Sequence, residues 1–210
     1  MKVTKLYPGS YYCNCYVVGE EGEPCFVIDP GCNNKGYLDN YIDKHHDGKL
    51  LGIFLTHGHF DHIGGLATLQ HKATLFIHSD DLEALSDPDL NCSTTFFDEG
   101  VTIDTDSWNI YQLDDEDEIN IGGVIVRVVH TPFHTKGSIC LYVEDEKTLF
   151  SGDTLFRLGV GRSDLKGGCP RYMEQSLNKL RVLPPETKVY PGHDKDTTIE
   201  NELKFNSYFK

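Results

Sequence analysis

Residues 56–62 read Thr-His-Gly-His-Phe-Asp-His, which places four potential metal ligands within six residues. In an extended chain alternate side chains point the same way, so His57 and His59 can face one ion. Asp61 and His62 are adjacent, diverge from each other and could serve a second ion a few ångströms away. Imidazole combined with carboxylate suits zinc, iron or manganese better than calcium or magnesium. The segment therefore predicts the main half of a two-metal hydrolytic centre.

Three later segments offer further ligands, each directly after a predicted strand. They read His-Thr-Pro-Phe-His-Thr from residue 130, Ser-Gly-Asp-Thr from residue 151 and Pro-Gly-His-Asp from residue 191. The end of a strand holds a side chain rigidly and is a common place for catalytic groups. One histidine alone would usually be structural, but four such segments indicate a shared site.

The elements that must position these residues can be predicted from apolar periodicity. The predicted strands are residues 11–18, 25–28, 50–55, 74–77, 110–113, 119–121, 124–129, 138–143, 148–150 and 188–190. The predicted helices are residues 37–46, 62–71, 79–85 with Ser79 as its cap, 171–182 and 198–208. Residues 86–108 lack periodicity and are expected to form a long connection. Strand-rich halves that each end in helices favour two packed sheets covered by helices, in one domain over residues 1–210.

The order H-x-H-x-D-H, T-P-x-H-T, S-G-D-T and P-G-H resembles the metallo-β-lactamase superfamily. The Ser-Gly-Asp-Thr-Leu-Phe and Gly-Arg-Ser-Asp-Leu segments from residues 151 and 161 resemble the short bacterial glyoxalase II-like (hydroxyacylglutathione hydrolase-like) hydrolases. The resemblance covers nearly the whole chain, from the Asp29-Pro-Gly turn to the helix after His193. It implies an α/β fold of the αββα four-layer sandwich type, with two mixed β-sheets flanked by helices.

The same resemblance implies a ligand for every position of a dinuclear centre. A first metal would be held by His57, His59 and His134. A second metal would be held by Asp61, His62 and His193, with Asp153 bridging both. His130 also precedes a Thr-Pro pair, but the ligand of the T-P-x-H-T pattern is His134, so we assign His130 a structural or supporting role. The remaining histidines are expected at the surface; they are His45, His46, His71 and His78.

The implied cofactors are two divalent metal ions, Zn²⁺ in the first place, with iron or manganese as alternatives. Such ions lower the pKa of a bound water to about 7, so hydroxide can attack a carbonyl at neutral pH. Asp61 would orient this nucleophile and shuttle its proton. No G-x-S-x-G elbow argues for a serine nucleophile. We therefore expect a glyoxalase II-like thioesterase that acts on a small thioester or ester.

The sequence signals for residues that would hold the rest of the substrate are weaker than those for the metal ligands. The chain ends about 17 residues after His193, without the helical extension that binds glutathione in full-length glyoxalase II. The connection 86–108 and the loop 155–170 are the candidates. Arg162 in the second loop could receive a substrate carboxylate, or it could pair with a nearby aspartate and brace the loop. Both alternatives stay open at this stage.

Three other functions compete with the thioesterase. A mononuclear-iron persulfide dioxygenase would use only His57, His134 and Asp153 as ligands. A lactonase would use the same centre on a cyclic ester. A non-catalytic binding module is disfavoured because such members lose ligands, whereas all seven positions are filled here.

Composition and charge limit the classes of partner that this protein is expected to bind. The formal net charge of −14 repels phosphate backbones and anionic membranes, so we expect neither nucleic acid nor membrane as a partner. The chain lacks a signal-like apolar segment and an apolar run of about 18 residues. Its seven cysteines show no paired spacing, which favours reduced thiols and a cytoplasmic location. Cys13 and Cys15 are expected to be small semi-buried residues without a redox or metal role.

Overall fold

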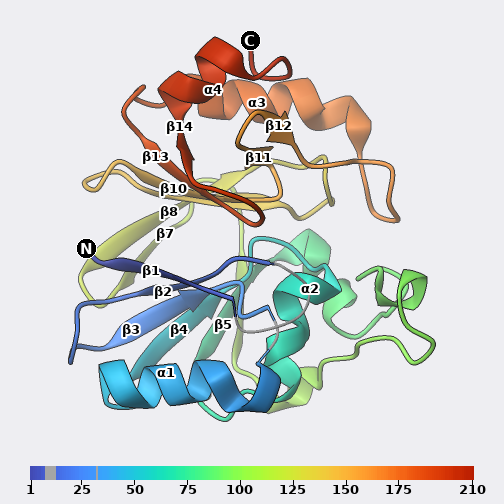
Figure 1. The fold of residues 1–210 in the computed structure, drawn as a ribbon. Coiled ribbons are helices and arrows are strands. Elements are labelled where there is room, and N and C mark those ends of the chain that lie inside the picture. Colours follow the sequence, from blue (N-terminus) through green and yellow to red (C-terminus); the bar gives the residue numbers. More distant parts are fainter. Residues whose placement is uncertain (8–12, 32) are drawn as a thin grey trace.

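The computed structural model describes residues 1–7, 13–31 and 33–210. Two six-stranded sheets pack face to face, and helices cover the outer face of each (Figure 1). This four-layer αββα arrangement confirms the predicted fold class. Among the described helices, none is long and apolar enough to cross a bilayer.

The first sheet is mixed. Its strands, in spatial order, are β1 (Val3–Leu6), β2 (Cys15–Val18), β3 (Cys25–Ile28), β4 (Leu50–Phe54), β5 (Thr74–His78) and β6 (Ile110–Leu113). The first three pair antiparallel, and β3 to β6 pair parallel. Parallel neighbours require crossovers: the one between β3 and β4 contains α1 (Tyr37–His46), which lies below this sheet in Figure 1, and the one between β4 and β5 contains α2 (Phe60–Ile63).

The second sheet is mixed as well. Its strands, in spatial order, are β14 (Thr197–Thr198), β13 (Lys188–Pro191), β10 (Thr148–Gly152), β9 (Ile139–Val143), β8 (Val124–His130) and β7 (Glu118–Ile121). The helices α3 (Met173–Arg181) and α4 (Ile199–Phe205) cover its outer face (Figure 1). A separate two-stranded hairpin, β11 (Leu155–Phe156) with β12 (Gly159–Val160), lies between β10 and α3 in the chain.

Continuous apolar strands are buried on both faces, which explains why they do not alternate with polar residues. In β3, Cys25 and Val27 belong to the cluster under the helices, while Phe26 and Ile28 belong to the cluster between the sheets. Phe54 at the end of β4 belongs to the inter-sheet cluster and stacks on Phe76 of β5, with ring centroids 4.5 Å apart. The predicted metal-binding segment therefore begins directly after a strand fixed by packing on two sides.

The structure differs from the sequence prediction mainly in short elements. The helix expected over 62–71 is only α2 followed by a 3-10 turn at Gly64–Ala67. A Cβ on Gly65 would lie 2.9 Å from the carbonyl oxygen of Pro30, so this glycine serves close backbone packing rather than helix. The segment Ser79–Leu85 is a 3-10 helix, and His78, not Ser79, caps it. The strands β1, β11, β12 and β14 were not predicted, and residues 11 and 12 of the predicted first strand lie outside the described residues.

Two of the four histidines expected at the surface are buried instead. His46 is 2% exposed and its Nδ1 lies 2.9 Å from the carbonyl oxygen of Glu23. His78 is 5% exposed and stacks on His130, with ring centroids 3.9 Å apart. The prediction was wrong for these two because their positions at an element's end resemble surface positions in sequence. His45 does pair with a surface glutamate.

The six cysteines among the described residues are free thiols. Cys15 is fully buried in the cluster under the helices, as expected for a small apolar residue. Cys13 is buried too, but its Sγ lies 3.5 Å from Nδ1 of His62. It therefore contacts a proposed metal ligand. Cys32 lies outside the described residues.

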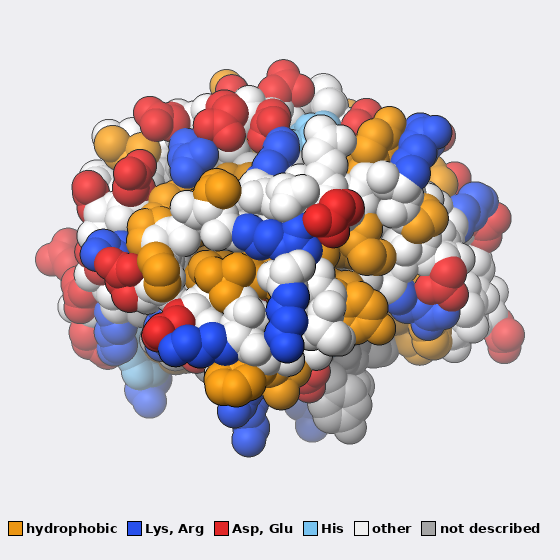
Figure 2. All heavy atoms as spheres, turned by 90° about the horizontal axis from the view of Figure 1, so that it is seen from above, with side chains coloured by type: hydrophobic (Ala, Val, Ile, Leu, Met, Phe, Trp, Pro, Cys, Tyr) orange, Lys and Arg blue, Asp and Glu red, His pale blue; other side chains and the backbone are white. Residues whose placement is uncertain are grey.

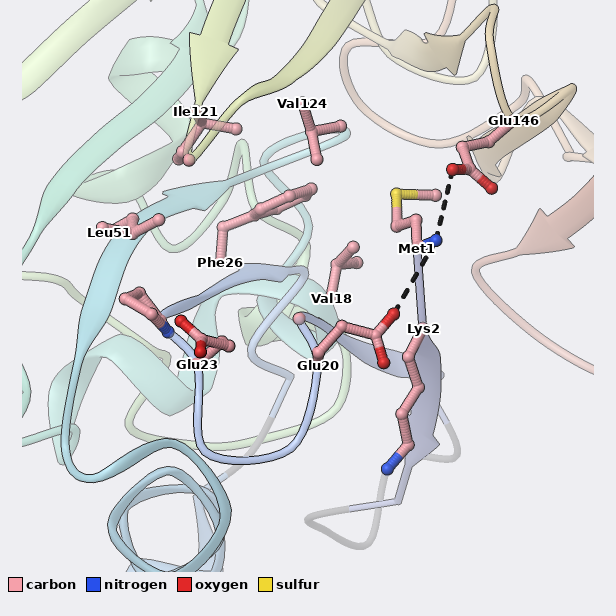
Figure 3. Close-up of a pocket in the computed structure, with 13 residues that line it drawn as sticks. Met1, Lys2, Val18, Glu20, Glu23, Phe26, Leu51, Ile121, Val124 and Glu146 are labelled. Atoms are coloured by element: carbon pink, nitrogen blue, oxygen red, sulfur yellow. Dashed lines mark hydrogen bonds and ion pairs between the residues drawn. The ribbon is translucent and has the colours of Figure 1, made fainter.

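The outer surface over α3 and α4 mixes charged and apolar side chains (Figure 2). A hollow of about 430 Å³ opens elsewhere, between the two sheets (Figure 3). Val18, Phe26, Leu51 and Val124 line it, and the dashed contacts join Met1 to two glutamates at its rim. Leu51 is the second residue of β4 and Val124 is the first of β8, so this hollow lies at the opposite end of the sheets from the predicted ligands. Histidine and aspartate are absent from its described lining, whose carboxylates come from Glu20, Glu23 and Glu146.

Candidate metal centre

All seven predicted ligands follow the carboxyl end of a strand, and the fold brings these ends together. The strands β8, β10 and β13 run in the same direction, because β8 and β10 are both antiparallel to β9 and β13 is parallel to β10. Their ends carry His134, Asp153 and His193. The end of β4 in the other sheet carries the segment 57–62. The ligands therefore meet where the edges of the two sheets face each other.

Three histidines form the first half of the cluster. His57 Nε2 lies 3.1 Å from His59 Nδ1, and His134 Nε2 lies 2.9 Å from the same atom. A tetrahedral shell with bonds of 2.0–2.1 Å separates ligand atoms by about 3.3 Å. All three side chains are buried. The trio has the spacing of ligands around one small cation.

The second half combines two histidines with two carboxylates. His193 Nε2 lies 3.1 Å from an oxygen of Asp61 and 3.6 Å from an oxygen of Asp153. His62 Nε2 lies 3.4 Å from the other oxygen of Asp153. Asp153 also lies 3.5 Å from His134 of the first trio. Its carboxylate thus stands between the two halves, where the sequence resemblance places a bridging ligand.

Contacts on the far side of the rings determine which nitrogen faces the cluster. Nδ1 of His62 contacts the Asp29 carboxylate at 2.9 Å, and Nδ1 of His134 contacts the carbonyl oxygen of Arg162 at 2.7 Å. Both acceptors can only receive a proton, so each Nδ1 carries the hydrogen and each Nε2 keeps its lone pair. Thr56 Oγ1, which donates to Asp29, accepts in the same way from Nδ1 of His57. The lone pairs therefore point into the cluster.

Burial and the charges of neighbouring groups shift the pKa values of the side chains in the cluster in different directions. Burial, together with neighbouring imidazoles, lowers the pKa of His57 well below its ordinary value and that of His59 to about 3. Burial would raise the pKa of Asp61, but the nearby His62 and His193 outweigh it and hold that pKa below its ordinary value. The pKa of Asp153 is likewise lowered, because the surrounding histidines outweigh its burial. Burial would lower the pKa of His62 and of His193, but Cys13 and the carboxylates around His62, and Asp61 and Asp153 around His193, outweigh it and raise both pKa values. Because neutral imidazoles with ionised carboxylates are the forms that ligate metals, these two rings would lose a proton on binding a cation.

Two buried polar atoms test whether the residues fit a metal ion. His62 Nε2 and Asp153 Oδ1 have no hydrogen-bond partner within the described parts of the chain. A buried polar atom left without a partner costs about 1–3 kcal/mol, and native proteins rarely leave one. Both atoms face the cluster, and His62 with Asp153 and His57 forms one of the three-residue groups able to hold an ion there. The donor set therefore fits divalent metal ions.

Two supporting carboxylates were not recognised in the sequence. Asp29, after β3, accepts from Thr56 N at 2.8 Å, besides its bond to His62. Asp81 accepts from Gly58 N at 2.9 Å and from Gly137 N at 2.8 Å, which joins the first ligand loop to the loop after His134. The Asp-Pro-Gly turn at 29 was a possible signal, because it too follows a strand. Nothing local distinguishes Asp81 from a residue in the first turn of a helix.

His130 lies outside the cluster. Its Nε2 donates to the carbonyl oxygen of Lys136 at 2.8 Å, and its ring stacks on His78. This position agrees with the structural role proposed from sequence. Together with Asp80, the stacked pair forms a separate group of possible ligands, of which Asp80 is exposed.

An open cleft of about 370 Å³ gives access to the cluster. Arg162 is one of its lining residues, and its guanidinium also makes two hydrogen bonds of 2.7 Å to the Asp164 carboxylate. Both alternatives foreseen for this residue are thus compatible with its position. A role for Arg162 in substrate binding remains a prediction.

Comparison with known proteins agrees with this geometry. The family described as the metallo-beta-lactamase superfamily matches residues 8–193. An uncharacterized protein of Mycobacterium tuberculosis is 35% identical, over 100% of this chain and 98% of its own length. The probable metallo-hydrolase YqgX of Bacillus subtilis is 32% identical, over 99% and 97%. A hydroxyacylglutathione hydrolase of Ectopseudomonas mendocina is 32% identical, over 81% of this chain and 56% of its own length.

Two solved structures share the whole fold. The B3 metallo-beta-lactamase BLEG-1 is 32% identical with a TM-score of 0.90, and the match covers 100% of both chains. The protein TTHA1623, solved in a di-iron-bound form, is 33% identical with a TM-score of 0.78, over 99% of this chain and 100% of that one. The strand-end ligands, the paired mixed sheets and these matches lead to one conclusion. The chain belongs to the metallo-β-lactamase superfamily and has the fold of its metal-dependent hydrolases.

Proposed function

We propose that this protein hydrolyses a small thioester at a dinuclear metal centre formed by the seven side chains described above. One observation carries the proposal: two ligand groups share Asp153, one made of His57, His59 and His134 and the other of Asp61, His62 and His193. A mononuclear centre would leave the second group without an ion. When bound, two divalent ions supply Lewis acidity and make hydroxide available near neutral pH.

The side chains of the site would transfer the proton and control the access of water to the cluster. The Asp61 carboxylate, 18% exposed and beside His193, reaches both the cluster and the cleft. As an ionised carboxylate it can accept the proton of the attacking water and later return it to the departing thiol. His59 and His134 line the cleft, whereas the buried His57 is not among its lining residues. Water can therefore approach the cluster from the cleft side.

Elemental analysis followed by a substrate panel tests this function. We expect two metal ions per chain and hydrolysis of thioesters. The panel adds a lactone, a persulfide with an oxygen electrode, and a β-lactam, because BLEG-1 is named a metallo-beta-lactamase. One iron per chain with oxygen consumption would replace the hydrolase by a dioxygenase. Zinc, iron and manganese are to be distinguished in the same measurement, since a relative named a zinc-dependent hydrolase and a di-iron neighbour point to different metals.

Replacing Asp61 by alanine tests the mechanism. We expect kcat to fall by at least about 10²-fold, because a positioned acid-base group contributes 10²–10⁴-fold. Circular dichroism should stay unchanged. Asp106→Ala, at an exposed aspartate remote in sequence from the ligands, is the matched control and should keep full turnover. Equal turnover in the two variants would rule out the proposed role of Asp61.

A further inference from the structure

Apart from Arg162, the described residues that line the cleft over the metal cluster and are not proposed ligands are apolar. Five of the nine lining residues are ligands, and the other four are Phe96, Phe156, Leu165 and Arg162. Phe96 is 60% exposed, and Phe156 and Leu165 are half-buried. An aromatic ring left this open at a cleft offers surface that gains free energy when a ligand covers it.

The ring of Phe96 is held in place although it is exposed. It packs on the ring of Phe60, with centroids 5.2 Å apart. Phe97 meets the Phe60 ring edge-on, with centroids 5.4 Å apart. Phe60 is 8% exposed and lies in sequence between the ligands His59 and Asp61. The exposed aromatic surface is therefore fixed beside the cluster by a buried anchor.

A second aromatic ring belongs to the same cleft. Phe156 of the β11–β12 hairpin meets the ring of His193 at 75°, with centroids 6.1 Å apart. Leu165 adds an aliphatic side chain from the loop that follows the hairpin. The connection 86–108 and the loop 155–170 thus each contribute apolar surface to the cleft, which we name the apolar wall (Phe96, Phe156 and Leu165).

Two cations of the loop 155–170, Arg162 and Lys166, already have carboxylate partners. Both oxygens of Asp164 accept from the Arg162 guanidinium. Lys166 contacts Asp89 at 3.0 Å, which ties the two loops together. A substrate carboxylate would have to compete with these partners. Among the described lining residues other than the proposed ligands, apolar contact is therefore the interaction that a substrate can make without displacing an existing ion pair.

We propose that the apolar wall binds an apolar group of several carbon atoms next to the scissile carbonyl. The substrate is then a thioester with an aliphatic or aromatic acyl or thiol part, and not one recognised through the carboxylates of glutathione. This inference rests on the proposed thioesterase function. The apolar part can belong to the acyl group or to the thiol group. The substrates of the test distinguish these two cases.

The test compares thioesters that differ in one part. The acyl arm uses acetyl, hexanoyl and phenylacetyl thioesters of N-acetylcysteamine, and the thiol arm uses acetyl thioesters of hexanethiol and of glutathione. We expect kcat/KM to rise by about tenfold or more toward the apolar member in one arm, since covering a few methylenes in an apolar pocket suffices for that. S-lactoylglutathione should be a poorer substrate than the preferred apolar thioester.

Variants assign the preference to the wall. Phe96→Ala should reduce the apolar-to-acetyl (or apolar-to-glutathione) ratio of kcat/KM by about tenfold, and Phe96→Leu should retain most of it. Phe205→Ala is the matched control, because Phe205 is 66% exposed on α4 and absent from the cleft lining; it should leave the ratio unchanged. The ratio is the readout, so a general loss of activity does not imitate the effect.

The two proposals can fail separately. Hydrolysis without apolar preference, or a ratio equally affected in Phe96→Ala and Phe205→Ala, overturns the apolar wall and leaves the thioesterase. If no thioester is hydrolysed, the thioesterase is overturned, and calorimetric binding of a hexyl thioether, which lacks the carbonyl, decides on the wall. Weaker binding to Phe96→Ala than to Phe205→Ala would then support it, and equal binding would refute it.

Discussion

Asp29 orders two proposed ligands through one side chain. Its carboxylate accepts from Nδ1 of His62 and from Oγ1 of Thr56, and that hydroxyl in turn faces Nδ1 of His57. The carboxylate thereby selects the tautomer of both rings. A supporting carboxylate of this kind fixes ring orientation and raises ligand basicity, and its loss typically costs 10–100-fold in metal affinity.

We therefore expect Asp29→Asn to weaken metal binding by about 10–100-fold, because an amide nitrogen there would face donors instead of accepting from them. Competition with a chelator of known affinity measures this. Asp39→Asn is the control: Asp39 is also a buried carboxylate, but it accepts from Asn33, Gln70 and His71, away from the cluster. Equal metal affinity in the two variants would contradict the role of Asp29.

The β11–β12 hairpin depends on α4 for its position. Glu202 of α4 is fully buried, and its Oε2 accepts from Leu158 N at 2.7 Å within the hairpin turn. Its other oxygen accepts from Thr197 at 2.6 Å. The hairpin carries Phe156 and leads to the Arg162 carbonyl oxygen that accepts from His134. A helix remote in sequence from the first ligands thus holds one side of the cleft.

Glu202→Gln tests this element. The amide would turn one acceptor into a donor among buried donors, so we expect unfolding free energy to fall by about 2–4 kcal/mol. Thermal unfolding should register this as a decrease of about 2–4 °C in Tm per kcal/mol. Glu200→Gln, on the same helix but pairing with Lys204 at the surface, should leave Tm unchanged. A Glu202→Gln protein as stable as the Glu200→Gln protein would show that the hairpin does not need this contact.

At the scale of the whole molecule, the proposed metal centre joins the two sheets. His57 and His59 follow a strand of the first sheet, and Asp153 and His193 follow strands of the second. Ions bound between these residues would link the two sheets at this edge of the sandwich. A ligand that binds only the folded state stabilises it by about 2.7 kcal/mol when present at 100 times its Kd.

Metal removal should therefore lower stability as well as activity. We expect chelation to reduce Tm by about 5–10 °C, from about 2–4 °C per kcal/mol for a chain of this size. Adding back a divalent ion should restore it. Asp153→Asn should lose most of this dependence, whereas Asp106→Asn should keep it. A Tm that ignores both chelation and metal addition would refute a shared centre between the sheets.

Local sequence determined much of this protein. The apolar runs at 50–55, 124–129 and 188–190 predicted strands that the structure contains with ends shifted by one residue or less. Runs buried on both faces are a local signal, and so are His and Asp residues placed directly after them. These two signals indicated two packed sheets covered by helices and four candidate ligand segments, and the family resemblance added the αββα type and the set of seven ligands. The short strands β11, β12 and β14 carry too few residues for any periodicity.

Tertiary structure decided which of these residues meet and what surrounds them. His59 and His134 are 75 residues apart, and Asp81 and Gly137 are 56 residues apart, so no local pattern reports their contact. Packing between distant segments also determines the burial of His78 and the apolar wall over the cleft. The pairing of Arg162 with Asp164 depends on the conformation of their loop. Sequence thus specified the ligands and the strands before them, because side-chain chemistry and periodicity are local. Their union into one centre, and the apolar character of its cleft, required the packing of two sheets.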